Sequence, residues 1–290
     1  MTAKIPAIAV IGFGEAGFTF ASAGGWEDAA ISYDIEPARA TKMDECGITC
    51  AGSAKEALES ADLVLSLVTA DQALPAARQY AAHLKAGTIW CDMNSVAPHT
   101  KQAAAEAVEA AGGRYVDVAV MAPVDPARLN VPLLFAGKDA LVAMALLREL
   151  GFAKTRVVGD NVGQASAIKL CRSIMVKGLE ALTAEMVMSA SSAGVLDEVL
   201  ASLDASEKHV SWRERADYNL DRMLLHGRRR SAEMAESAAM IRVLGITPLM
   251  TDGTIEWQSS LGGLGVRPLP DGLEEKIAAV KASPTRKGDS

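Results

Sequence analysis

Cysteine, histidine and aromatic residues are scarce in this chain. Its 290 residues include four cysteines and four histidines, and aromatic residues make up 4%. Cys46 and Cys50 lie close together, but no histidine or acidic cluster completes a metal-ligand set around them, and no histidines have H-x-x-x-H spacing. We therefore predict reduced thiols, with neither a disulfide framework nor a metal site.

Long apolar runs and basic stripes are also absent. No uninterrupted apolar segment is long enough to span a bilayer, and the first predicted strand follows Met1 without an apolar leader. The net charge is −7, from 29 basic and 36 acidic residues, and no basic stretch is interleaved with aromatics. We expect a cytoplasmic protein that binds neither membranes nor nucleic acid.

The N-terminal segment carries the most informative pattern. Residues 7–17 read Ala-Ile-Ala-Val-Ile-Gly-Phe-Gly-Glu-Ala-Gly, an apolar strand that leads into Gly12, Gly14 and Gly17 at G-x-G-x-x-G spacing. In a dinucleotide-binding turn these glycines permit a tight turn, clear the backbone for a pyrophosphate and allow close packing of the next helix. The N-terminus of that helix attracts phosphates. The other predicted cofactor contacts in this loop are Phe13, Glu15 and Ala16.

A second apolar run ends in Asp34, 22 residues after the first glycine. A carboxylate at this position accepts the ribose hydroxyls of an adenosine and repels a 2′-phosphate, which favours NAD over NADP. Arg39 and Lys42 follow closely and could reach a 2′-phosphate, so NADP is an alternative cofactor. Val68 and Thr69, after the next predicted strand, are further candidate cofactor contacts.

Strands and helices alternate through residues 1–160. The predicted strands are 6–11, 29–34, 62–67, 87–92, 114–121, 131–136 and 154–158. The predicted helices are 15–25, 36–46, 53–60, 70–83, 98–111 and 138–150. This alternation indicates an α/β Rossmann domain, with a doubly wound and mostly parallel sheet that binds NAD(P).

The pattern becomes helical from residue 161. Residues 161–193 contain no proline and carry apolar residues at helical spacing, which predicts one long helix. Further helices are predicted at 195–203, 205–225, 227–244 and 271–281. A helix as long as the first exceeds the usual globular length. We therefore predict an all-α C-terminal domain over 161–290 that binds substrate and forms a dimer.

A lysine near the start of the long helix is the candidate acid/base. Lys169 ends the stretch Gly163-Gln-Ala-Ser-Ala-Ile-Lys169, and a lysine there could take a proton from a substrate hydroxyl. Arg172 lies three residues later on the same helix face and could lower the pKa of that lysine. The alternative is an ordinary solvated helix lysine.

Two polar motifs have both a structural and a functional interpretation. Asn94-Ser95 follows a predicted strand and precedes a helix, where it could cap the helix or contact the nicotinamide ribose or substrate. The run His226-Gly-Arg228-Arg229-Arg230 could be a solvated basic turn or an interface cluster. It could instead clamp a substrate carboxylate or phosphate, because arginine binds such groups bidentately.

Taken together, these motifs resemble the β-hydroxyacid dehydrogenase family, which includes 3-hydroxyisobutyrate, tartronate semialdehyde and 6-phosphogluconate dehydrogenases. The family's D-x-S-T-x-x-P stretch resembles Asp92-Met-Asn94-Ser95-Val-Ala-Pro98. Its G-x-G-x-x-x-K motif resembles Gly163-Gln-Ala165-Ser-Ala-Ile-Lys169, with alanine for the second glycine. The resemblance implies an NAD(P) cofactor, Lys169 as the catalytic acid/base and a homodimer with interleaved helical domains.

Two departures indicate a divergent branch of that family. The substrate loop, D-A-P-V-S-G-G in the family, reads Asp117-Val-Ala-Val-Met121-Ala-Pro123-Val here and lacks the serine and paired glycines. Arg172 and Ser173 replace two asparagines after the lysine motif. The identity of the substrate therefore does not carry over from the family. The expected substrate contacts are Asn94, Ser95, Met121, Arg172, His226 and Arg228, the last three toward an anionic group.

The resulting hypothesis is an NAD(P)-dependent oxidoreductase. It would transfer hydride between nicotinamide and the carbinol carbon of a small hydroxylated substrate such as a β-hydroxy acid. An imine or ketone reductase on the same scaffold is one alternative, although an aspartate or tyrosine often replaces the lysine in imine reductases. A non-catalytic protein that senses NAD is the other.

Overall fold

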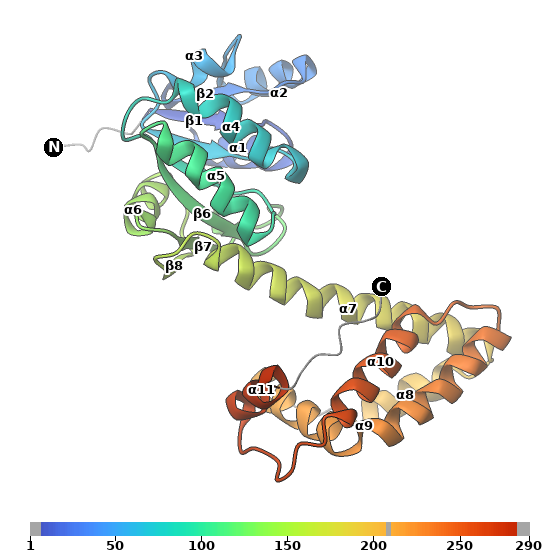
Figure 1. Cartoon of the computed structure of the whole chain (residues 1–290). Coiled ribbons are helices and arrows are strands. Elements are labelled where there is room, and N and C mark those ends of the chain that lie inside the picture. Colours follow the sequence, from blue (N-terminus) through green and yellow to red (C-terminus); the bar gives the residue numbers. More distant parts are fainter. Residues whose placement is uncertain (1–6, 207–209, 283–290) are drawn as a thin grey trace. The chain divides into compact units, whose positions relative to one another are not determined.

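The computed structural model describes residues 7–206 and 210–282 (Figure 1). Contacts divide the chain into two compact units, Met1–Ile174 and Met175–Ser290, so that α7 (Gln164–Ser192) contributes to both. The division into a cofactor-binding and a substrate-binding domain at residue 160 stays a prediction. Each unit is described separately below.

The first unit is built on an eight-stranded sheet (Figure 1). Its strand order is β3-β2-β1-β4-β5-β6-β7-β8, and neighbouring strands pair in parallel except β6 with β7. The order of the first six strands is that of doubly wound dinucleotide-binding sheets, which confirms the predicted fold class. The strands are β1 (Ile8–Ile11), β2 (Ala30–Tyr33), β3 (Thr49–Cys50), β4 (Leu63–Ser66), β5 (Ile89–Asp92), β6 (Arg114–Val120), β7 (Leu133–Ala136) and β8 (Thr155–Gly159).

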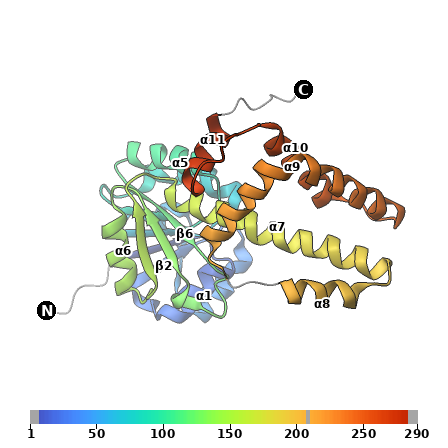
Figure 2. The ribbon, with the colours of Figure 1, turned by 90° about the horizontal axis from the view of Figure 1, so that it is seen from below.

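Helices cover both faces of this sheet. Ile8 and Val10 of β1 pack into one core and Ala9 and Ile11 into the other, because successive strand side chains point to opposite faces. One core includes α1 (Glu15–Gly24), α2 (Ala40–Glu45) and α6 (Ala140–Glu149). The other includes α3 (Ala54–Leu58), α4 (Ala73–Tyr80) and α5 (Pro98–Ala110). Figure 2 shows α1 and α5 on opposite sides of the strands. Burial on both faces explains the continuous apolar runs in the sequence.

The second unit is helical in its described part. It contains most of α7 together with α8 (Leu196–Ser206), α9 (Trp212–Val243), α10 (Leu249–Gly263) and α11 (Leu273–Ala282). The long helix predicted at 161–193 is therefore confirmed as α7. None of the helices in the described ranges is long and apolar enough to cross a membrane.

The helices predicted at 205–225 and 227–244 are joined in one helix, so the predicted break between them was wrong, and α10 was not predicted. A single helix, α9, runs without a break through His226 and Gly227. A Cβ added at Gly227 would lie 2.2 Å from the carbonyl oxygen of Gln258, and one at Gly262 would lie 2.4 Å from the backbone nitrogen of Arg228. These glycines therefore allow α9 and α10 to approach closely and do not end a helix. Residues 207–209, which belong to the helix predicted at 205–225, lie outside the described residues.

Candidate functional site

The glycine-rich loop connects β1 to α1 and has the geometry that the sequence predicts. Gly12 has φ +91°, and a Cβ there would lie 2.7 Å from the carbonyl oxygen of Leu67. A Cβ at Gly17 would lie 2.8 Å from the carbonyl oxygen of Gly12, so this glycine packs against the loop itself. Gly14 faces open space. Glycine is thus required at the first and third positions, and the second leaves room for a ligand.

The carboxylate of Asp34 fixes this loop to the end of β2. Its Oδ2 accepts a hydrogen bond from the backbone N–H of Phe13 at 2.6 Å, and its Oδ1 accepts one from the backbone N–H of Glu36 at 2.8 Å. A carboxylate accepts up to about four hydrogen bonds, so both oxygens keep capacity for ribose hydroxyls.

A pocket of about 370 Å³ opens at the carboxyl ends of β1, β2 and β4. This is the point at which the strand order reverses between β1 and β4, where doubly wound sheets bind their ligands. Its volume, the open space at Gly14 and the adjacent carboxylate fit the adenosine half of a dinucleotide. The predicted cofactor contacts that line it are Gly12, Gly14, Asp34, Val68 and Thr69.

The two basic residues that could reach a 2′-phosphate are placed differently. Arg39 lines the pocket, but its Nη2 lies 3.1 Å from Oε2 of Glu36 and forms an ion pair with it. Lys42 does not line the pocket, and its Nζ lies 5.5 Å from the centre of the Phe18 ring. Glu36 would therefore compete with a 2′-phosphate for Arg39, the arginine that lines the pocket.

The remaining predicted cofactor contacts lie outside the pocket lining. The side chain of Phe13 is buried in the core, and Ala16 packs against the same core. Glu15 is exposed in the first turn of α1, and Ser95 is exposed in the segment after β5. Gly17 is buried.

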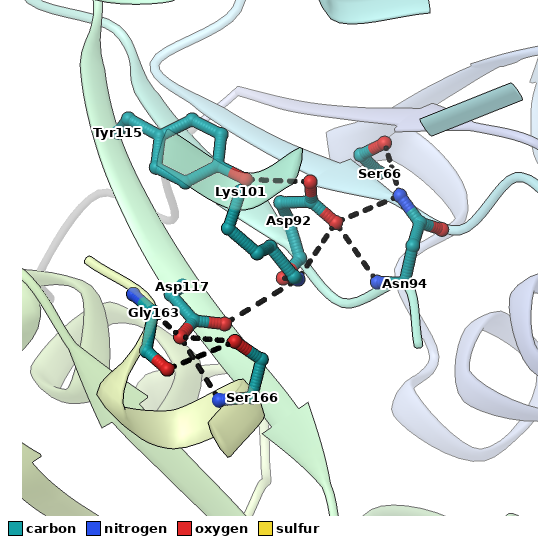
Figure 3. Close-up of polar contacts among 8 residues, drawn as sticks. All are labelled: Ser66, Asp92, Asn94, Lys101, Tyr115, Asp117, Gly163 and Ser166. Carbon is teal, nitrogen blue, oxygen red and sulfur yellow. Dashed lines mark hydrogen bonds and ion pairs between the residues drawn. The ribbon is translucent and has the colours of Figure 1, made fainter. Parts of the chain in front are cut away.

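A buried ionic network lies beside the end of β5 (Figure 3). The Lys101 side chain on α5 is fully buried, and its Nζ donates to the carbonyl oxygen of Asp92 at 2.6 Å and to Oδ1 of Asp92 at 2.9 Å. The same Nζ lies 3.4 Å from Oδ1 of Asp117. One lysine therefore compensates two buried carboxylates, which would otherwise be costly to remove from water.

The second carboxylate of the network holds the start of α7. Oδ2 of Asp117 accepts hydrogen bonds from the backbone N–H groups of Gly163 at 3.1 Å and Ser166 at 3.0 Å, and from the Ser166 hydroxyl at 3.2 Å. These N–H groups belong to the first turn of a helix and have no intrahelical partner. Lys169 follows on α7, about one turn after Ser166.

The first carboxylate of the network holds Asn94. Oδ1 of Asp92 accepts the backbone N–H of Asn94 at 2.9 Å and its side-chain amide at 2.8 Å, and the amide also donates to the Ser66 hydroxyl at 3.1 Å. Oδ1 of Asn94 is buried and has no hydrogen-bond partner in the described part of the chain. This acceptor is available to a ligand.

Tyr115 completes the network. Its hydroxyl donates to Oδ2 of Asp92 at 2.6 Å. Burial, together with the nearby Asp92 carboxylate, raises the pKa of Tyr115 well above its usual value. The phenol therefore stays protonated and acts only as a donor to the carboxylate.

Sequence reasoning singled out the stretch from Asp92 to Ser95 but missed the lysine that joins it to α7. A signal was present, because Lys101 occupies the same helical face as the buried Ala104, Ala105 and Val108. A lysine on the apolar face of a helix requires a buried acidic partner. Asp117, flanked by valines in the middle of a buried strand, was the matching signal.

The other predicted site residues occupy both units. Met121 follows β6 and packs against a small apolar cluster that includes Ala165 at the start of α7. Lys169 is half-buried on α7, and Arg172 is exposed three residues later. His226 and Arg228 are exposed on α9, in the second unit. The roles assigned to these side chains remain predictions.

Comparisons with protein families match the two parts of the chain to two models. The model described as the NAD binding domain of 6-phosphogluconate dehydrogenase matches residues 7–151, half of the chain. A model described as a domain of unknown function (DUF1932) matches residues 190–261. The first match agrees with the pocket, the glycine loop and the strand order described above.

Comparisons with individual proteins agree with these models. A solved structure of a conserved hypothetical protein from Sinorhizobium meliloti 1021 is 35% identical, covers 96% of each chain and has a TM-score of 0.62. Another, a conserved protein described as structurally similar to 3-hydroxyacid dehydrogenases, is 28% identical, covers 94% of this chain and 98% of its own, and has a TM-score of 0.59. The 3-hydroxyisobutyrate dehydrogenase of Pseudomonas aeruginosa is 25% identical over 194 residues, 62% of each chain.

Imine reductases share the architecture at lower identity. The enzyme from Myxococcus stipitatus, solved with NADP⁺, is 19% identical, covers 89% of this chain and 95% of its own, and has a TM-score of 0.70. At that identity the likeness concerns the fold alone. From its NAD-binding domain and its relatives, this chain belongs to the β-hydroxyacid dehydrogenase family, in a divergent branch that carries a DUF1932 domain.

Proposed function

We propose that the protein is an NAD-dependent dehydrogenase that oxidises the hydroxyl-bearing carbon of a small β-hydroxy acid, with Lys169 as the acid/base. Bound NAD⁺ supplies the hydride acceptor, so an alcohol becomes a carbonyl and a proton is released. The observation that carries the proposal is the buried network of Lys101, Asp92 and Asp117, which connects the segment of Asn94 to the start of α7.

The two ends of this network support different roles in the proposed reaction. Asp117 fixes the first turn of α7, and Lys169 follows on that helix. In the proposed reaction the Nζ of Lys169 takes the proton from the substrate hydroxyl. Oδ1 of Asn94 accepts a hydrogen bond from the substrate or the nicotinamide carboxamide. Ser95, exposed next to it, is a further contact for either group.

A preference for NAD over NADP is part of the proposal. Asp34 presents a carboxylate where the ribose hydroxyls bind, and Glu36 engages Arg39, the basic residue at the pocket. A 2′-phosphate would face two carboxylates and would have to displace one of them from the arginine.

We also propose that the protein is a homodimer that uses the exposed apolar face of α7. Met175, Leu179 and Leu182 recur at helical spacing there and are 43–48% exposed. An exposed stripe of this kind on a long helix is typical of an interface, because water contact with it is unfavourable.

The direct test measures NADH formation from NAD⁺ with a panel of small β-hydroxy acids. Lys169→Ala should lower turnover by about 10²–10⁴, the usual contribution of a positioned acid/base. Its affinity for NAD⁺, measured by fluorescence titration, should stay unchanged because the adenosine pocket is elsewhere. Lys138→Ala, which removes an exposed lysine before α6, is the matched control.

Other outcomes would replace the proposal. Turnover of cyclic imines by a Lys169→Ala enzyme that keeps wild-type rates would select an imine reductase. NAD⁺ binding without oxidation of any panel member would select a protein that senses NAD.

A further inference from the structure

A second pocket lies inside the helical unit, between α9 and α10. These helices run side by side (Figures 1 and 2) and approach closely at Gly227 and Gly262. The pocket has a volume of about 410 Å³, within the range of about 300–1,000 Å³ for small-molecule sites. It is lined by Tyr218, Asn219, Arg222, Met223, Arg230 and Gln258.

Among the described residues, the two arginines of this pocket have no acidic partner. The Nε atoms of Arg222 and Arg230 are buried without a hydrogen-bond partner, and no ion pair to either side chain occurs among the described residues. Elsewhere in this unit Arg242 pairs with Asp252 at 2.8 Å. Two partly buried guanidinium groups that have no counter-charge among the described residues favour the binding of an anion between them.

A buried amide oxygen adds a second, independent feature. Gln258 is only 7% exposed, and its Oε1 is buried without a hydrogen-bond partner in the described part of the chain. An unpaired acceptor at this depth is costly unless a ligand donates to it. Tyr218 forms another wall, with its ring centre 5.9 Å from the guanidinium carbon of Arg222.

We propose that this pocket binds a small oxyanion that also carries a hydroxyl group. The carboxylate or phosphate lies between Arg222 and Arg230, whose planar guanidinium groups match its geometry, and the hydroxyl donates to Oε1 of Gln258. The continuous helix α9 places these arginines about two turns apart, whereas the sequence predicted a break between residues 225 and 227 that would separate them. Arg228, the arginine first assigned to an anion, does not line the pocket.

The proposal can be tested without cofactor or turnover, so its outcome is separate from that of the redox assignment. Glycerate and inorganic phosphate are titrated into the full chain by calorimetry at constant ionic strength. If only glycerate binds saturably, the ligand is a carboxylate. If only phosphate binds saturably, the ligand is a phosphate. Absence of saturable binding for both would overturn the proposal.

Substitutions then locate the binding. Arg222→Met and Arg230→Met should each weaken binding at least about tenfold, as expected for a lost charge-assisted hydrogen bond. Arg229→Met removes the same charge from the neighbouring exposed position of α9, which does not line the pocket, and should change binding less than about twofold. Equal losses in all three variants would mean non-specific attraction and would refute the site.

Two further variants guard against misfolding and test the hydroxyl contact. Each variant must bind NADH as the wild type does, and Arg222→Lys, which keeps the charge but not the planar fork, should bind with intermediate affinity. Gln258→Met should remove the preference for glycerate over propionate, which has no hydroxyl, and leave phosphate binding nearly unchanged. If Gln258→Met still prefers glycerate over propionate, Gln258 does not bind a ligand hydroxyl and that part of the proposal is wrong.

Discussion

Large buried apolar side chains, among them Trp90, Phe20 and Phe135, are concentrated in the first unit, around the sheet. In the second unit, the buried apolar side chains among those described are Ala190, Leu224, Ala238, Pro248 and Leu261. Large apolar side chains such as Leu179 and Trp257 are exposed there. The first unit thus has its own core, whereas the helices of the second leave apolar surface that another chain could cover.

Charged groups differ between the units in the same way. In the first unit Lys101, Asp92 and Asp117 are fully buried and compensate one another. In the second unit, Lys276 is also buried, but its partners Asp217 and Asp221 are about one third exposed, and the Arg242–Asp252 pair is about half exposed. Two pocket arginines there have no acidic partner among the described residues. Buried polar groups whose hydrogen bonds are all made are held rigidly, so the network of the first unit is suited to position reacting groups. The unpaired arginine Nε atoms of the second unit suit it to bind a ligand.

The largest expected effect is on the buried network of the first unit. Lys101→Met leaves two buried carboxylates without a cation and should lower the free energy of unfolding by about 3–5 kcal/mol. Lys85→Met removes an exposed lysine that lies 2.8 Å from Asp62 and should cost at most about 1 kcal/mol. Urea denaturation followed by circular dichroism measures both.

A second substitution sharpens this prediction. Adding Asp117→Asn to Lys101→Met should recover part of the lost stability, because the amide does not need a cation. If Lys101→Met and Lys85→Met lower the free energy of unfolding by equal, small amounts, burial does not make the first lysine more important for stability than the second. The contrast between buried and exposed charges would then be wrong.

The next effect concerns the exposed apolar face of the second unit. Leu179→Glu should weaken the proposed dimer by about 1.5–3 kcal/mol per copy, the value of burying one leucine. Leu141→Glu changes a leucine that is 66% exposed on α6 of the first unit and should leave self-association unchanged. Sedimentation velocity over a range of protein concentrations measures the dissociation constant. A wild-type chain that stays monomeric at micromolar concentration would contradict the proposed interface.

The cofactor pocket should show a smaller effect. NADH should bind more tightly than NADPH by about 1–3 kcal/mol, because the Asp34 carboxylate loses ribose hydrogen bonds and faces a phosphate. Asp34→Asn should reduce this difference, and fluorescence titration with both cofactors measures it. Arg39→Met is the control, since it should not abolish a preference that depends on the carboxylate. Equal affinity in the wild type would mean that Arg39 outweighs Asp34.

The smallest effect concerns a helix cap in the second unit. Glu185 of α7 accepts the backbone N–H groups of Met250 at 2.8 Å and Thr251 at 3.0 Å, and also the Thr251 hydroxyl, in the first turn of α10. Burial acts to raise the pKa of Glu185, but these hydrogen bonds outweigh it and lower the pKa below its usual value. Glu185→Gln should cost about 0.5–2 kcal/mol, the range for a lost cap.

This cost should depend on pH. Because the folded carboxyl has the lower pKa, its contribution is full above the ordinary value of 4.5 and is lost as the pH falls through the folded pKa. Thermal unfolding at several pH values should therefore separate wild type from Glu185→Gln near neutrality and bring them together in acid. Glu256→Gln, at an exposed position of α10, is the control. A difference that persists in acid would assign the effect to packing.

Local sequence was sufficient for the features that depend on neighbouring residues. The apolar run before Gly12 and the spacing to Asp34 predicted the strand, the turn and the cofactor pocket, because each depends on backbone geometry over a few residues. The apolar periodicity after residue 161 likewise predicted α7, since helical burial repeats every few positions.

Only the tertiary structure decided the remaining features, because their stabilising partners are distant in sequence. Asp117 holds the start of α7 from 46 residues away, and Glu185 holds the start of α10 from 65 residues away. The sequence predicted two helices that meet at Gly227, but the close approach of α10 gives this glycine a packing role within one helix. The buried lysine network and the pocket of Arg222 and Arg230 arise for the same reason, since only folding brings their members together.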